Sequence, residues 1–236
     1  GRKADLRAFM SSPLDSGLGP FLRKHGVSLR STYVLDAQNQ PVQVTQRRGF
    51  FTFANVIPYP LFPVVTDLDR GHPLTRELQS LSLPFAAALH LSSASSGAVW
   101  TVLARSSPRS WVRSVWEKGF AHSISPLEAV APGPVDPPGP YVLAAVSEGP
   151  FGPGAKPGGR LLLVGTAGFS RPGLPVGESG AAFLLNAVDW MLQEEDLIAI
   201  RSKDVAERPL RELSPAAKVF TGFSPFRTST FPFVMM

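Results

Sequence analysis

The sequence predicts an α/β fold in which flanking helices cover a mainly parallel sheet. Three observations predict it: continuous apolar runs of strand length, a glycine-containing loop between one such run and an amphipathic helix, and proline- and glycine-rich loops between the runs. The chain has 236 residues, with 24 prolines and 21 glycines, and 44% are hydrophobic. That fraction can form a packed core, so we expect one domain over residues 1–215 and an apolar tail over 216–236.

The first elements are a short helix and a small hairpin. Residues 12–26 begin with residues that favour a helix start and end at Gly26, which favours a helix stop. Residues 27–36 have the apolar pattern of a strand, and residues 42–46 alternate apolar and polar side chains. An Asn-Gln-Pro turn separates the two segments, so we expect them to pair with each other.

Two less regular segments follow. Residues 50–66 contain three prolines between positions 58 and 63, which are incompatible with a helix or a central strand there. We interpret this segment as an apolar loop that either packs over the edge of the core or docks a partner. Residues 72–81 carry Pro73 in a first-turn position ahead of spaced leucines, which predicts a second helix.

The second half of the chain carries the fold prediction. Four apolar runs have the pattern of strands covered on both faces: 83–91, 97–106, 141–149 and 160–164. A glycine-containing loop follows the last of them, then residues 178–195 repeat apolar side chains at helical spacing, and residues 196–202 predict a final strand. Strand, loop, helix and strand in this order indicate a βαβ unit and hence a parallel sheet.

Composition excludes several chemistries. With no cysteine, the chain has no disulfide, no thiolate metal site and no cysteine nucleophile. The sequence has no phosphate-binding loop, no zinc-protease motif and no G-x-S-x-G motif, so we expect no cofactor, no metal site and no assigned catalytic residue. The net charge of +5 is spread along the chain without a basic block, which argues against a nucleic-acid partner.

One site-like feature follows from the predicted topology. Ligands of parallel sheets bind beyond the carboxyl ends of the strands. Ser107 and Ser170 each follow a predicted strand, so both would line a cleft there. The alternative function is therefore a hydrolase or an amidotransferase-like enzyme that uses this cleft.

Six stretches of the chain form a characteristic series. They are FLRKHGVSLRSTYVLD (21–36), VIPYPLFPVV (56–65), HPLTRELQSL (72–81), TVLARSSPRSW (101–111), RLLLVGTAGFS (160–170) and FLLNAVDWMLQEEDLIAIRSKD (183–204). In this order they resemble the auxiliary proteins of uncharacterised, gliding-motility-type ABC transport systems. The resemblance covers about residues 14–215, and its most specific motif is the Leu-Asn-Ala-Val-Asp-Trp helix.

The resemblance implies a flavodoxin-like or glutamine-amidotransferase-like domain on the extracytoplasmic, periplasmic side of a cell membrane. It also implies ABC permease and ATPase subunits as partners and membrane anchoring through segments that this sequence lacks. It supplies no catalytic residues. Relative to the family pattern the chain corresponds to part of a larger domain, so we expect an exposed sheet edge that missing residues or a partner would cover.

These observations lead to a non-enzymatic accessory domain as the expected function. It would bind protein partners or an extracellular polymer in a transport or gliding-motility system, as a homo- or hetero-oligomer. Aromatic side chains often dominate protein interfaces. We therefore expect Tyr59, Phe62 and Trp111 to be partner contacts.

Overall fold

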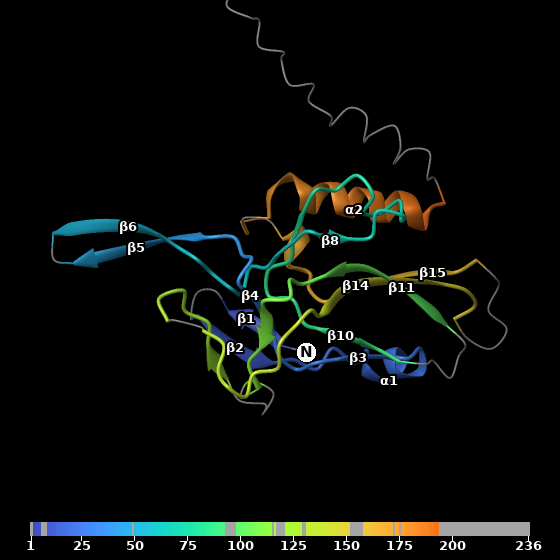
Figure 1. Ribbon diagram of the computed structural model, residues 1–236, viewed down its shortest axis with the longest axis horizontal. Helices are drawn as coiled ribbons and strands as arrows, with labels where there is room; N and C mark the ends of the chain where they lie inside the picture. Colours follow the sequence, from blue (N-terminus) through green and yellow to red (C-terminus); the bar gives the residue numbers. More distant parts are fainter. Residues whose placement is uncertain are drawn as a thin grey trace, which may run out of the picture. The chain divides into compact units, whose positions relative to one another are not determined.

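A computed structural model describes most of the first 193 residues (Figure 1). The described residues are 2–5, 9–48, 50–92, 98–114, 116, 121–128, 131–151, 158–171, 173–174 and 176–193. The predicted strand at 196–202 and the predicted tail at 216–236 lie outside them.

Strands dominate the described elements, and most of them are short. In chain order they are β1 (Arg2–Asp5), β2 (Met10–Pro13), α1 (Gly19–Lys24), β3 (Val27–Leu29), β4 (Val34–Asp36), β5 (Val42–Arg48), β6 (Phe51–Ile57), β7 (Val64–Val65), β8 (Asp67–Leu68), β9 (Leu81–Ser82), β10 (Leu89–Leu91), β11 (Val99–Arg105), β12 (Ser110–Val112), β13 (His122–Ser123), β14 (Val142–Glu148), β15 (Arg160–Val164), the 3-10 turn η2 (Gly168–Ser170) and α2 (Gly177–Met191).

The sheets are antiparallel, so the prediction of a parallel, flavodoxin-like or glutamine-amidotransferase-like α/β fold is wrong. Every strand pairing in the described part of the chain is antiparallel. The largest sheet has six strands in the order β3-β10-β14-β11-β8, with β15 also paired to β14. Smaller sheets join β1, β2 and β13, and the pairs β4–β12, β5–β6 and β7–β9.

The central position of β14 explains the error. This strand pairs with β11 along one edge and with β15 and β10 along the other. Its residues from Leu143 to Ser147 are all buried, so both faces are covered. A central antiparallel strand covered on both faces has the same continuous apolar pattern as a parallel strand. The predicted strands over 97–106, 141–149 and 160–164 are confirmed; only their direction of pairing differs.

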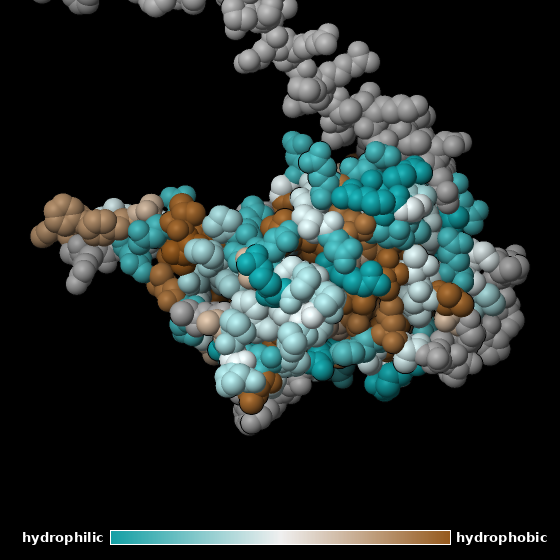
Figure 2. Space-filling view, viewed as in Figure 1, coloured by the Kyte–Doolittle hydropathy of each residue, from teal (hydrophilic) through white to brown (hydrophobic). Residues whose placement is uncertain are grey.

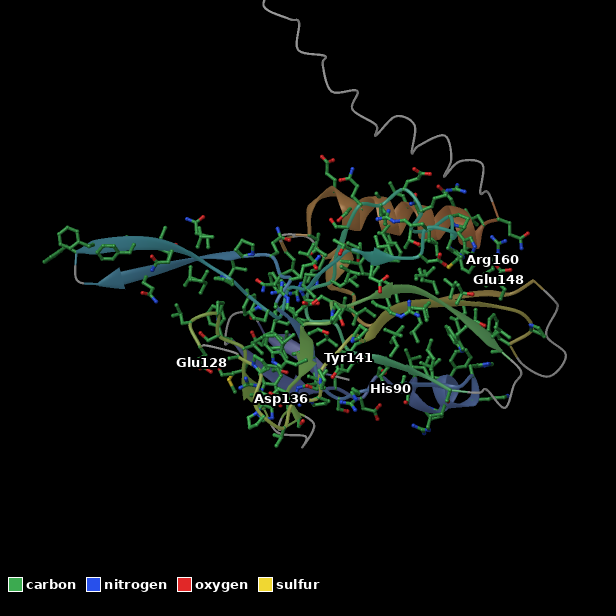
Figure 3. The ribbon with its side chains drawn as sticks, in the orientation of Figure 1. His90, Glu128, Asp136, Tyr141, Glu148 and Arg160 are labelled. Atoms are coloured by element: carbon green, nitrogen blue, oxygen red, sulfur yellow. The ribbon has the colours of Figure 1, made fainter. Side chains whose placement is uncertain are left out.

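Helix α2 forms where the spacing predicts it, but only part of the predicted apolar set packs into the same core, since Leu184, Val188, Met191 and Leu192 are exposed. Phe183, Ala187 and Trp190 are buried and belong to the cluster that includes side chains from β11 and β14. Arg160 joins this helix to the sheet: its guanidinium lies over the Trp190 ring, 4.9 Å from the centroid, and donates to the Trp190 carbonyl. In Figure 3, Glu148 lies beside Arg160 at the neighbouring strand end, with a Nε–Oε1 distance of 3.9 Å.

Two predictions near the N-terminus are only partly right. The expected helix over 12–26 shortens to α1, and Gly26 follows it with a φ of +74°, the left-handed conformation that ends helices. The expected hairpin between 27–36 and 42–46 does not form. Instead β4 pairs with β12, far along the chain, and β5 pairs with β6. Strand β6 also replaces the first half of the loop predicted over 50–66.

The segment before β10 departs from the predictions in both of its parts. Residues 72–81 form turns rather than a helix, with the His72 carbonyl accepting from the amides of Thr75 and Arg76. Within 83–91 only β10 is a strand. Pro84 has no amide to donate, and Phe85 has a φ of +57°, so the pleated ladder cannot run through them.

Candidate functional site

Strands β5 and β6 form a hairpin that extends away from the rest of the described fold (Figure 1). We call these strands and their turn, residues 42–57, the arm. Seven residue pairs hold it together, from Val42 opposite Ile57 to Arg48 opposite Phe51. At about 3.4 Å per residue, the arm is roughly 24 Å long. Neither strand pairs with another strand in the described residues, so both outer edges have free hydrogen-bonding groups.

The arm has one apolar face that changes from half-buried to exposed along its length. Residues opposite each other in an antiparallel pair share a face, and alternate residues along a strand share it too. Val42 and Val44 therefore lie on the same face as Phe51 and Phe53. The two valines are half-buried near the base, whereas both phenylalanines are exposed towards the tip. The same face also holds Gln46, Arg48 and Asn55, so polar residues interrupt it, but each of its four residue pairs has at least one apolar member from the base of the arm to its tip.

The tip carries exposed aromatic rings. Phe50 is 98% exposed and Phe51 is 70% exposed, and the apolar arm is visible at the left of Figure 2. Arg47 and Arg48 precede them, and the sequence between Asp36 and Asp67 contains no acidic residue. Exposed apolar patches of this kind mark interaction sites in soluble proteins. The arm is therefore the strongest candidate for a binding surface in this fold.

The predicted partner contacts Tyr59, Phe62 and Trp111 lie at the base of the arm and are buried. With Tyr33, Leu35, Leu61, Trp116 and Ile124 they form a second core cluster, here called the base cluster. The premise that they are exposed aromatics is wrong. Tyr59 and Phe62 nevertheless line a groove of about 430 Å³, together with the half-buried valines of the arm. That these residues contact a partner stays a prediction; a partner side chain in the groove would lie next to Tyr59 and Phe62.

Tyr59 is fixed in this cluster by its hydroxyl group. The Tyr59 hydroxyl donates to the Ile124 carbonyl at 2.6 Å, and its ring lies 4.8 Å from the Phe62 ring, centroid to centroid. Burial raises the pKa of Tyr59 well above its usual value, and the nearby Tyr33 raises it further. The hydroxyl is therefore neutral at physiological pH, and it acts as a structural donor.

Ser107 holds a buried carboxylate. Its hydroxyl donates to Asp36 Oδ1 at 2.5 Å and its amide donates to Asp36 Oδ2 at 2.8 Å, while the Gln38 amide also donates to Oδ1. Asp36 is fully buried at the end of β4. These bonds tie β4 to the turn before β12, which gives Ser107 a structural role.

Ser170 follows β15 as Ser107 follows β11. Both strands pair antiparallel with β14, so they run in the same direction and their carboxyl ends lie at the same edge of the sheet. Ser170 ends η2, and its hydroxyl donates to the Ala167 carbonyl at 3.1 Å. The Ser107 and Ser170 hydroxyls are therefore bound to different partners, Asp36 and Ala167.

In the described residues, no group of three or more His, Asp and Glu side chains is placed to hold a metal ion. No helix in that same part of the chain is both long enough and apolar enough to cross a membrane.

The predicted partner contacts do not include Phe50, Phe51 or Phe53, which are the exposed aromatic residues of the arm. The prolines of residues 50–66 predict a loop there, which hides the strand that holds Phe51 and Phe53. A local signal was present: Phe51, Thr52 and Phe53 alternate, and Arg-Arg-Gly before them suits a hairpin turn. The alternation covers Phe51 to Phe53, and the first proline of the segment stands only at Pro58.

Comparison with known proteins gives one family match. A family model described as an ABC-type uncharacterized transport system matches residues 2–178. The searches of curated proteins and of solved structures find no match.

Proposed function

Because the chain belongs to the family of ABC-type uncharacterized transport systems, we propose that it is a non-enzymatic accessory component whose arm binds a protein subunit of the transporter. The observation that carries this proposal is the row of apolar side chains along one face of the arm, which begins at the groove at its base and ends with exposed phenylalanines towards its tip. The partner we expect is the ABC permease or its ATPase.

Three properties of the arm favour a protein as its partner. The apolar face offers phenylalanine side chains towards its tip, and aromatic residues are enriched at the cores of protein interfaces. The free edges of β5 and β6 can accept an additional strand from a partner. The groove at the base has room for side chains of the same partner segment, next to Tyr59 and Phe62. A polypeptide can use all three features at once.

The test is co-purification of the tagged protein from native membranes, with a variant that removes the exposed rings. In the double variant Phe50→Ser and Phe51→Ser we expect recovery of the permease and ATPase, identified by mass spectrometry, to fall at least tenfold. The matched control is Val99→Ser with Val135→Ser, because these side chains are 76% and 74% exposed and lie outside the arm. The control should retain the partners.

Three outcomes would contradict the proposal. Recovery of the same ABC subunits with both double variants would show that the arm is not the docking element. Absence of any ABC subunit from the wild-type preparation would show that the permease and the ATPase are not its partners. Binding of the purified protein to protein-free lipid vesicles, lost in the arm variant, would assign the arm to a membrane surface instead of a protein.

We propose the extracytoplasmic side of the membrane as the place of action. The absence of cysteine supports it, since exported proteins work under oxidising conditions. Protease added to spheroplasts should degrade the protein there and should leave a cytoplasmic marker intact; protection of both would contradict the proposal. A role in gliding motility, self-association and binding of an extracellular polymer stay predictions of the sequence resemblance.

A further inference from the structure

A second groove, separate from the arm, lies between β1, α1 and the end of β15. Its volume is about 690 Å³, which is in the range of small-molecule sites. Aliphatic side chains form most of its wall. The leucines that line it are Leu14, Leu18, Leu22, Leu29, Leu163 and Leu174.

The floor of this groove is built by close backbone packing. The Ala87 amide donates to the Gly165 carbonyl at 2.8 Å, and the Gly165 amide donates to the Leu143 carbonyl at 2.8 Å. A Cβ atom at Gly165 would overlap the Ala87 carbonyl oxygen. Glycine is thus required for this approach. The groove floor is fixed by the main chain and does not depend on a ligand to form.

Tyr33 contributes a buried hydroxyl group to the wall. Its side chain is 2% exposed, and its hydroxyl has no hydrogen-bond partner in the described residues. Burial raises the pKa of Tyr33, while the nearby Ser11 hydroxyl and the charge of Arg2 lower it by a smaller amount. The Ser11 hydroxyl lies close to the Tyr33 hydroxyl, but the two do not form a hydrogen bond of normal geometry. A buried hydroxyl without a partner is costly, and a ligand oxygen would satisfy it.

Positive charge lies beside that hydroxyl. The Arg2 guanidinium is held next to Tyr33 by donation to the Ser11 hydroxyl at 2.8 Å and to the Trp116 carbonyl at 2.7 Å. Arg171 is exposed at the rim, and Asp5 is the acidic residue among the described lining residues. The two arginines and one aspartate give the lining a net positive charge. An anionic oxygen is the group that best matches a protonated tyrosine beside arginine.

We propose that this groove binds a single acyl chain that carries an anionic head group. The leucines would enclose the aliphatic chain, and the head group would accept from the Tyr33 hydroxyl beside Arg2. The inference goes beyond the accessory function and is independent of the arm, so each can fail without the other.

The test uses the full chain and the fluorescence of dansyl-labelled undecanoic acid. We expect saturable binding with a rise in fluorescence as the dansyl group leaves water. Dodecanoate should displace the probe at least tenfold better than dodecanol, because the alcohol lacks the anionic head group. Displacement by lysophosphatidylglycerol in place of dodecanoate would identify a membrane lipid as the source of the chain, whereas preference for dodecanoate would identify a free fatty acid.

Two variants test the two ends of the site. Tyr33→Phe removes only the unpartnered hydroxyl and should weaken dodecanoate binding about tenfold, the value of one good hydrogen bond. The matched control is Tyr141→Phe, because the Tyr141 hydroxyl donates to the Pro137 carbonyl and does not line the groove. Leu18→Glu places a carboxylate in the apolar wall at a side chain that is already exposed, and it should abolish saturable binding.

Thermal unfolding shows whether a variant that fails to bind is still folded. Leu18→Glu should melt like its control Val99→Glu, which carries the same change at an exposed residue away from the groove. The proposal is overturned if the wild type shows no saturable binding. It is also overturned if Tyr33→Phe and Leu18→Glu, both folded, bind the probe and dodecanoate as tightly as the wild type.

Discussion

The arm and the base cluster are neighbours in the sequence but opposite in environment. Phe51 and Phe53 lie on the exposed face of the arm, while Tyr59 and Phe62, a short way along the chain, are buried in the base cluster. Both sets are aromatic, and both lie within one segment free of charged residues. Aromatic content alone therefore does not separate a binding surface from a core. Burial decides whether a ring stabilises the fold or remains available to a partner.

Because of this difference, we expect mutations in the base cluster to affect stability and mutations at the tip of the arm to affect binding. Changes in the base cluster should lower the free energy of unfolding, because they leave cavities or unpaired polar groups. Changes at the tip of the arm should leave the free energy of unfolding unchanged and should affect binding only. A substitution that affected both properties would contradict the division.

The largest expected effect is that of Phe62→Ala in the base cluster. The Phe62 ring contacts Tyr59 and Phe85, with centroids 4.8 Å and 5.2 Å away, and it is buried. Truncation of a buried phenylalanine costs about 3–5 kcal/mol, since apolar contacts are lost and a cavity remains. Urea unfolding should show this loss, and Phe51→Ala on the arm should change the free energy of unfolding by less than about 0.5 kcal/mol. Equal losses would remove the distinction.

Tyr59→Phe should have the next largest effect, because it deletes one buried hydrogen bond and keeps the ring. The Ile124 carbonyl would lose its donor from Tyr59, at a cost of about 1–3 kcal/mol. Tyr141→Phe is a control with a similar bond to a carbonyl at a half-buried side chain, and it should cost less. Urea unfolding of both variants measures the difference. A larger loss for Tyr141→Phe would show that burial is not what sets the cost.

The elements with a strong local pattern could be predicted from the sequence, and their pairing could not. Helix α2 follows from apolar residues at helical spacing, of which Phe183, Ala187 and Trp190 are buried. Strand β14 follows from its apolar run. The partner of β4 is β12, which is distant in the sequence, so no local pattern reports it. Covered strands have the same composition in parallel and antiparallel sheets, which is why the fold class was wrong.

The candidate site shows the same limit at the level of single residues. The sequence located the segment, since residues 50–66 were interpreted as a possible docking surface. It could not tell that Phe51 is exposed and Phe62 is buried, because burial depends on the chain that packs around each ring. Ser107 is a further case. Its position after a strand predicts a role in an active-site cleft, but its hydroxyl donates a hydrogen bond to the buried carboxylate of Asp36.

The free energy of unfolding should fall gradually at alkaline pH because of two tyrosines in the base cluster. Burial raises the pKa of both Tyr59 and Tyr33 in the folded state above their usual value near 10. Above about pH 10 the unfolded chain loses these protons while the folded chain keeps them, so deprotonation favours unfolding. The ionisation of Tyr59 should lower the free energy of unfolding by about 1.4 kcal/mol per pH unit there, and Tyr33 acts in the same direction; both contributions are fully present below pH 10.

Urea unfolding between pH 8 and pH 11 measures this decline. In Tyr59→Phe the slope above pH 10 should be smaller than in the wild type, because one of the two protons is absent. A pH dependence identical in the two proteins would show that Tyr59 ionises as easily in the folded chain as in the unfolded one. That result would contradict its burial in a neutral form.

The smallest expected effect on stability is at the tip of the arm, and it is the most informative for function. Phe50→Ser changes a side chain that is 98% exposed, so it removes almost no packing and should shift the free energy of unfolding by less than about 0.5 kcal/mol. The same change removes an aromatic anchor from the proposed docking face. A variant with wild-type unfolding and reduced recovery of the ABC subunits would separate binding from folding in one residue. If Phe50→Ser instead destabilises the protein, the tip must pack against other residues, and the arm cannot be a free docking surface.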